Sequence, residues 1–303
     1  MSISRLDANA FTRIFKHGSF SRTSRIVNRL FLIQLCLSSS HRSFALGASQ
    51  AHLSLHNSRA IPTTSYTSQT SRTMATVSRT DPAIQDILDY WFGLSPNDWF
   101  MGSVSQDAII KERFAPLVEK ARLTDELDAT WTSTPSGSLA LVILLDQFTR
   151  NIFRVGNHED PGLSFSGDVK ALRLASEAIA KGYDRRIQQE NESKPLLGIP
   201  HRYFFYLPFM HAENLPSQIA CRALFEVMKQ EGEVAQLKRL AEGKEDSEAE
   251  KTIQDLVEKG GEFSQKHLDC VSALGRFPKR NEPLGRGHTE AERQWLEVHP
   301  MGF

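Results

Sequence analysis

The segment TPSGSLALVILLDQFTRNIF, residues 134–153, is apolar through its centre and ends in charged and amide side chains. Thr134 followed by Pro135 is a common start of a helix, because the Thr side chain caps free N–H groups and Pro has none to lose. The apolar stretch is too long for a strand, although Val142 and Ile143 favour strands. A helix that is apolar nearly all round must be surrounded by other elements. The segment therefore predicts a helix bundle built around it.

Similar signals mark the ends of other helices. Asp81 before Pro82 predicts a helix start, and Gly93 predicts the end of that helix. Near the other end of the chain, Thr289 and Glu292 have the spacing of a capping box. Each signal lies within a few consecutive residues, so the positions of these helix ends can be predicted without knowing the fold.

Apolar or amphipathic segments fill much of the remaining sequence, and no segment shows the alternation expected of a strand. These segments are residues 105–122, 168–181, 201–213, 216–232 and 263–277. Residues 183–199 are polar and then rich in Pro and Gly, which predicts a loop. We therefore predict an all-α antiparallel bundle of about eight to ten helices for residues 80–303.

The first part of the sequence has a different composition. Residues 1–79 hold ten Lys and Arg but a single acid, Asp7, and are rich in Ser and Thr. We predict a disordered segment with the composition of a mitochondrial transit peptide. Two alternatives are a cytoplasmic protein translated from Met74 and, less favoured, a secretory signal around the apolar residues 30–37.

The rest of the chain is acidic, with 26 basic and 35 acidic residues in residues 80–303. Non-specific nucleic-acid binding needs clustered basic residues, so this composition argues against a nucleic-acid partner. Cys221 and Cys270 lie in apolar helical patterns and are expected to be unreactive core residues. No apolar run is long enough to span a membrane. The sequence has no P-loop, no GxGxxG motif and no pattern that predicts a cofactor.

The motif LLDQFTRNIFR follows the central apolar run. Asp146, Arg150 and Arg154 are spaced to lie along one stripe of the helix, with Asn151 beside them. The structural alternative is an ion pair at the helix end, with Asn151 as its C-cap.

A second motif, YLPFMHAEN, contains His211 and Glu213. Two residues apart, they would not share a helix face, but a chain break favoured by Pro208 and Pro216 would let both point into one cavity. The structural alternative is a core histidine with satisfied hydrogen bonds and a carboxylate that caps a helix.

The third motif is GRFPKRNEPLGRGHT, in which Arg276, Lys279, Arg280 and Arg286 accompany one acid, Glu282. Its Gly and Pro residues predict an irregular loop. Guanidinium groups on such a loop are typical of sites that bind carboxylate or phosphate. A solvated basic loop is the structural alternative.

Together, LLDQFTRNIFR, YLPFMHAEN and GRFPKRNEPLGR resemble the signatures of an uncharacterised helical family, the domain-of-unknown-function family 924. The resemblance extends over about residues 82–300. It implies an all-helical, TPR-like fold and carries no established activity. The sequence departs from the family pattern at Thr149, often proline, and at Ala212, often serine, while the charged positions are intact.

We hypothesise that the three motifs converge on one polar pocket. Its residues would be Asp146, Arg150, Asn151, Arg154, His211, Glu213, Arg276, Arg280, Asn281 and Arg286. Five arginines against two carboxylates predict a positive pocket for a small anionic ligand or a peptide carboxylate. The favoured function is a binding or scaffold module. The alternative is a hydrolase-type enzyme in which His211 is the general acid/base and Glu213 orients it. A metal site at Asp146, His211 and Glu213 is the least favoured alternative, because the sequence lacks an HExxH motif or a close His pair.

Overall fold

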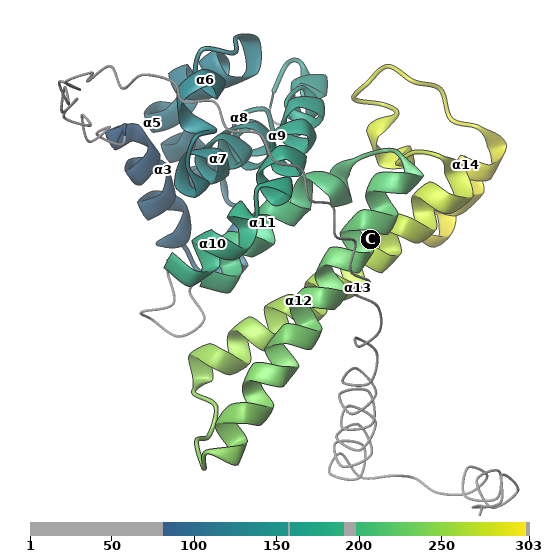
Figure 1. Cartoon of the computed structure of the whole chain (residues 1–303). Helices are drawn as coiled ribbons and strands as arrows, with labels where there is room; N and C mark the ends of the chain where they lie inside the picture. Colours follow the sequence, from purple (N-terminus) through teal and green to yellow (C-terminus); the bar gives the residue numbers. More distant parts are fainter. Residues whose placement is uncertain (1–80, 157, 191–197, 301–303) are drawn as a thin grey trace, which may run out of the picture. The chain divides into compact units, whose positions relative to one another are not determined.

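The computed structural model describes residues 81–156, 158–190 and 198–300 (Figure 1). By its contacts the chain divides into two units, Met1–Met74 and Ala75–Phe303, and all described residues belong to the second unit. The predictions made for residues 1–79 lie outside the described residues. No described helix is both long and apolar enough to cross a membrane.

The described residues form helices and no strand, which confirms the all-α class. The α-helices are α3 (Pro82–Phe92), α4 (Pro96–Met101), α5 (Val104–Leu123), α6 (Asp128–Trp131), α7 (Pro135–Val142), α8 (Thr149–Ile152), α9 (Asp168–Ala180), α10 (Tyr183–Glu190), α11 (Gly198–His211), α12 (Leu215–Ala241), α13 (Glu248–Leu274) and α14 (Glu290–Val298). Three short segments complete them: the π-helical η1 (Ile143–Phe148) and the 3₁₀ helices η2 (Pro161–Phe165) and η3 (Pro278–Arg280). The TPR-like arrangement that the resemblance implies stays a prediction.

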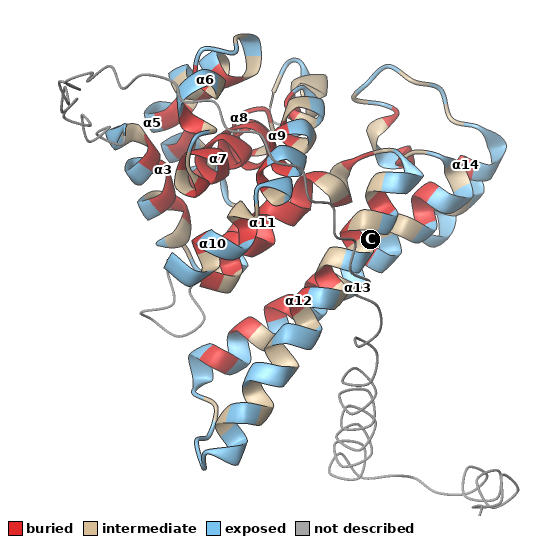
Figure 2. Cartoon of the chain, in the orientation of Figure 1, coloured by how far each residue is buried: buried red, intermediate tan, exposed pale blue. Residues whose placement is uncertain are grey.

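The predicted central helix is present as the continuous run α7, η1 and α8. Thr134 caps it by accepting a hydrogen bond from the backbone N–H of Gly137. Every residue from Gly137 to Thr149 is buried, and Figure 2 shows the burial concentrated on α7 and α11. The π-helical turn at η1 was not predicted, and there the hydroxyl of Thr149 donates to the carbonyl of Leu144. Turns of this kind are frequent at functional sites.

Aromatic side chains join α3, the central helix and α11. The ring of Trp91 meets Phe148 and Phe204 edge to face, with both centroid distances 5.5 Å. Edge-to-face contacts between large buried rings contribute beyond their apolar burial. The core thus holds the ends of α8 and α11, which carry two of the charged motifs, in place.

Two expectations about local structure were wrong. Residues 183–190 form α10 and not a loop, because Ile187 is buried and Asp184 accepts a hydrogen bond from the hydroxyl of Tyr206 on α11. Pro208 does not break its segment, since α11 continues to His211. The side-chain amide of Gln218 on α12 donates to the carbonyls of Phe209, Met210 and Ala212, and so closes the end of α11.

The helices α12 and α13 are each 27 residues long and lie side by side (Figure 1). Gly260 allows this packing, because a Cβ there would lie 2.5 Å from the ring of Phe225 and 2.6 Å from that of Tyr203. The next residue, Gly261, has open space at the same position, with no atom within 4 Å. Of two adjacent glycines, only Gly260 is required by packing.

We expect Gly260→Ala to lower the free energy of unfolding by about 1–3 kcal/mol, because the added methyl overpacks a buried contact. Gly261→Ala is the matched control and should stabilise the protein by up to about 1 kcal/mol through the better helix propensity of alanine. Urea denaturation of both variants measures the difference. Equal stability of the two would contradict the packing role of Gly260.

Candidate functional site

Asp146 lies in η1 with no exposed surface, although it is a carboxylate within an apolar helix. Its Oδ2 accepts a hydrogen bond from the amide of Gln147. Its Oδ1 lies 2.7 Å from Nδ1 of His211 and 3.3 Å from Nη2 of Arg150. Burial alone raises the pKa of this carboxyl, but the charges of His211 and Arg150 and the hydrogen bonds outweigh burial and lower the pKa to about 2. Asp146 is therefore ionised at neutral pH.

His211 is the last residue of α11, and 19% of its side chain is exposed. Because its Nδ1 faces a carboxylate oxygen, which only accepts, the ring donates from Nδ1. The sequence hypothesis named Glu213 as the residue that orients His211. That assignment was wrong, because the orienting carboxylate is Asp146, 65 positions away in the chain.

Arg150 joins three segments. Its Nη2 contacts both Asp146, at 3.3 Å, and Asp168, at 2.9 Å, and its Nη1 donates to the carbonyl of Ser164 at 3.0 Å. Asp168 begins α9, and Gly167 lets α9 approach η1, since a Cβ there would lie 2.2 Å from the carbonyl oxygen of Leu145. The helix end in the first motif is thus tied to the start of α9.

Arg280, the last residue of η3, brings the third motif to the same place. Its Nη1 lies 2.9 Å from Oδ2 of Asp168, so Arg150 and Arg280 share one carboxylate. Its guanidinium carbon lies over two aromatic rings, 4.6 Å from the ring centroid of Phe165 and 4.9 Å from that of Phe277. Burial lowers the pKa of Arg280, and the neighbouring charge of Arg150 acts in the same direction, against the opposing effect of Asp168. We call Asp146, Arg150, Asp168, His211 and Arg280 the central cluster.

Glu213 joins the second and third motifs beside the central cluster. Its two oxygens accept hydrogen bonds from Arg286 at 2.7 and 2.9 Å, and its Oε1 also accepts from the backbone N–H of Phe277 at 2.7 Å. Burial raises the pKa of Glu213, but the bonds from Arg286 and Phe277 outweigh it, so the pKa is lowered. Glu213 thus holds the third motif against the end of α11.

The remaining predicted residues make other contacts. Asn151 and Arg154 both bond to Asp107 on α5. Arg276 forms an ion pair with Glu292 on α14. Asn281 lies 3.0 Å from His288, between its side-chain amide nitrogen and Nδ1 of the histidine ring. These partners lie outside the central cluster.

The expected excess of positive charge is not found among the described residues. Each of the five predicted arginines contacts a carboxylate. Three of these carboxylates were not predicted from the sequence: Asp107, Asp168 and Glu292. Asp107 and Asp168 lie in the first turns of their helices, where acids are common for local reasons. Because acids are ordinary at these positions, the sequence did not indicate that Asp107 and Asp168 also pair with arginines of the charged motifs.

His267 on α13 was also missed. Its ring centroid lies 6.4 Å from that of His211, and its Nδ1 lies 2.8 Å from the carbonyl oxygen of Phe263. Burial lowers the pKa of His267 to about 3, and His211, Arg280 and Arg150 add to this effect. His267 is therefore neutral at pH 7 and belongs to the surroundings of the central cluster.

The described residues contain no group of three or more His, Cys, Asp or Glu side chains that could hold a metal ion. Asp146 and Glu213, two of the three predicted ligands, are instead bound to arginines. Cys221 and Cys270 are buried free thiols, as expected, and burial raises both pKa values, that of Cys270 to about 12.

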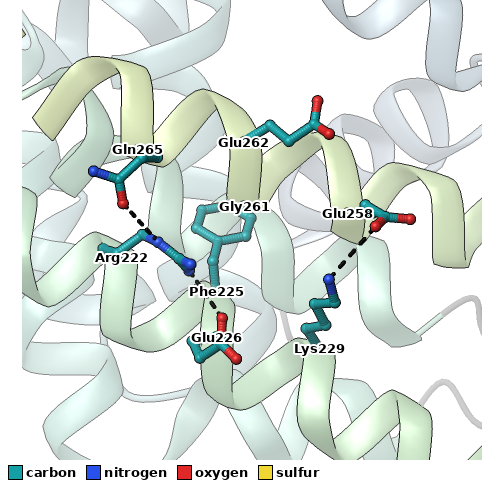
Figure 3. A pocket seen from close by; sticks show the side chains of 8 residues that line it. All are labelled: Arg222, Phe225, Glu226, Lys229, Glu258, Gly261, Glu262 and Gln265. Atoms are coloured by element: carbon teal, nitrogen blue, oxygen red, sulfur yellow. Dashed lines mark hydrogen bonds and ion pairs between the residues drawn. The ribbon is translucent and has the colours of Figure 1, made fainter. Parts of the chain in front are cut away.

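A pocket of about 260 Å³ lies between α12 and α13 (Figure 3). It includes no predicted site residue. Its cations already have partners, because Arg222 bonds to Glu226 and Gln265, and Lys229 to Glu258. The lining residues are Arg222, Phe225, Glu226, Lys229, Glu258, Gly261, Glu262 and Gln265.

The low pKa of Asp146 predicts how stability depends on pH. Since its pKa falls from 3.8 to about 2 on folding, Asp146 contributes stability above pH 4 and loses this contribution as the pH falls through 2. The contribution is about 2 kcal/mol. We expect Asp146→Asn to be less stable than the wild type at pH 7, with a smaller difference at pH 2. Denaturant titrations at both pH values measure this, and a constant difference would contradict the assignment.

A family model described as "Bacterial protein of unknown function (DUF924)" matches residues 87–299. The solved structure of a protein of unknown function from Agrobacterium tumefaciens, ATU0120, is 30% identical, with 73% of this chain and 99% of that chain covered and a TM-score of 0.54. No curated protein matches the chain. The family match covers more than half of the sequence and contains all three charged motifs. The chain therefore belongs to the DUF924 family.

Proposed function

We propose that the central cluster is a binding site for the anionic group of a small ligand. The observation that carries the proposal is the environment of Arg280. Its guanidinium has five N–H groups, but within the described residues only Nη1 forms a hydrogen bond, to Asp168. The other N–H groups can therefore donate to a carboxylate or phosphate oxygen of a ligand.

The two aromatic rings favour this function over simple bracing. Phe165 and Phe277 contact the Arg280 guanidinium through their rings, and these contacts form no hydrogen bond with its N–H groups. Arg286, in contrast, makes two hydrogen bonds to the carboxylate of Glu213, as expected of an internal brace. A preoriented guanidinium loses little freedom on binding an anion, which improves affinity.

The charges of the cluster also leave a place for an anion. Arg150 and Arg280 are balanced by Asp146 and Asp168, but Asp146 is additionally engaged by His211. Asp146 thus divides its charge between His211 and Arg150, and Asp168 divides its charge between Arg150 and Arg280. An anionic ligand would add negative charge beside these two arginines in a partly buried environment, where charge interactions are strong.

The test is anion binding to the full chain, with inorganic phosphate as the probe. We expect phosphate to raise the melting temperature of the wild type, because a ligand that binds only the folded state stabilises it. Arg280→Ala should weaken phosphate binding at least about tenfold, since a hydrogen bond to a charged group contributes about 1.5–3 kcal/mol. Isothermal titration calorimetry measures the affinity.

Arg293→Ala is the matched control for this experiment. Arg293 is an exposed arginine on α14, paired with the exposed Glu290, and lies outside the central cluster. This variant should bind phosphate as tightly as the wild type does. Chloride is added so that all titrations have the same ionic strength. The proposal is wrong if phosphate does not bind the wild type, or if it binds Arg280→Ala equally well.

The contact between Asp146 and His211 supports a second candidate, a hydrolytic enzyme that uses the same site. A buried carboxylate that holds Nδ1 of a histidine is the arrangement that prepares Nε2 as a general base. In this candidate, Nε2 takes a proton from water as the water oxygen adds to an ester of the bound anion. The same proton then passes to the alcohol that leaves, so that ester and water give acid and alcohol.

We expect such an enzyme to hydrolyse 4-nitrophenyl phosphate or 4-nitrophenyl acetate, measured by release of nitrophenolate. His211→Asn should lower the rate by about 100-fold or more, the usual effect of losing a general base. Unchanged hydrolysis in this variant, or none in the wild type, would count against the enzyme and leave the binding proposal standing.

A further inference from the structure

The central cluster presents two kinds of hydrogen-bonding group to a ligand. Arg150 and Arg280 carry guanidiniums, which donate and never accept. They recognise the negative charge of an anion, but they cannot distinguish phosphate from sulfate or one carboxylate from another. Any finer selection must come from a group that accepts hydrogen bonds.

His211 supplies such an acceptor. Its Nδ1 donates to Asp146, whose carboxylate has no exposed surface and is also bound by Gln147 and Arg150. The acid stays ionised at neutral pH, because its pKa is about 2. In a neutral imidazole that carries its proton on Nδ1, Nε2 has a free lone pair.

Nε2 of His211 is also accessible. It makes no hydrogen bond to any described residue, and 19% of the His211 side chain is exposed. The other titratable groups of the central cluster and its surroundings are Asp146 on η1, Arg150 on α8, Asp168 on α9, His267 on α13 and Arg280 on η3.

On the basis of the proposed anion site, we propose that the ligand of this site carries a hydroxyl group beside its anionic group. The guanidinium of Arg280, with that of Arg150, binds the anionic oxygens, and Nε2 of His211 accepts the hydrogen bond of the hydroxyl. Two sources have this chemistry: a protonated phosphate, which has a P–OH group, and a 2-hydroxycarboxylate. Sulfate and simple carboxylates lack the hydroxyl donor.

The experiment compares two matched pairs of anions by calorimetry at pH 8 and constant ionic strength. The pairs are inorganic phosphate with sulfate, and lactate with propionate. We expect the wild type to bind the hydroxyl-bearing member of at least one pair about tenfold more tightly, because one buried hydrogen bond contributes binding free energy of about that size. A preference within the first pair identifies the ligand group as a phosphate, and a preference within the second pair identifies it as a 2-hydroxycarboxylate.

His211→Asn separates this inference from the proposed function. The asparagine amide can keep the contact with Asp146 but has no equivalent of Nε2, so both members of a pair should bind with similar affinity. Arg280→Ala should instead weaken the binding of all four anions. If the wild type binds none of them, the anion site itself is wrong.

Two further results would overturn only the inference. One is equal binding within both pairs by the wild type at pH 8, and the other is a preference that persists in His211→Asn. Because that variant could fold poorly, the imidazole nitrogens of the wild type are also observed by ¹⁵N NMR at pH 8, with and without the preferred anion. The signal of Nε2 should be that of a nitrogen without a proton and should shift when the anion binds, and a signal that does not change on binding would contradict the role of Nε2.

Discussion

The buried carboxylate of Asp146 is the constraint on which the rest of the charged network depends. An unpaired carboxylate in an apolar helix costs several kcal/mol, so its oxygens must meet donors or cations. His211, Arg150 and Gln147 provide them. This requirement draws the end of α11 to η1 and, through Arg150, brings the start of α9 to the same place. The apolar core supports the arrangement, because Phe148 and Phe204 both pack against Trp91.

The network outward from Asp146 combines two roles. Pairs such as Glu213 with Arg286, or Arg154 with Asp107, engage both partners and tie a loop or helix end to its neighbour. Arg280 differs, because two aromatic rings hold it and one oxygen of a shared carboxylate binds it. A protein that needed only a brace there would gain more from a bidentate pair. This difference is the physical reason for separating a ligand site from its supporting contacts.

Much of the helical structure could be predicted from the sequence, because the signals that start and end helices are local. Asp81 and Thr134 cap the helices that they were expected to cap, and Thr289 forms its capping box with Glu292. The prediction failed at α10, where polar composition suggested a loop. There, burial of Ile187 and the bond between Asp184 and Tyr206 outweigh the local preference.

By itself, the sequence determined that the chain is helical, that one apolar helix lies at its centre, and that three charged motifs stand out from the rest. Only the tertiary structure decided which acid meets which base. Asp146 and His211 are 65 positions apart, and Asp168 and Arg280 are 112 apart. A guanidinium pairs with any carboxylate that the fold brings within reach, so the local pattern holds no information about its partner. For the same reason, the assignment of Glu213 to His211 was wrong, while the charged positions themselves were visible from the start.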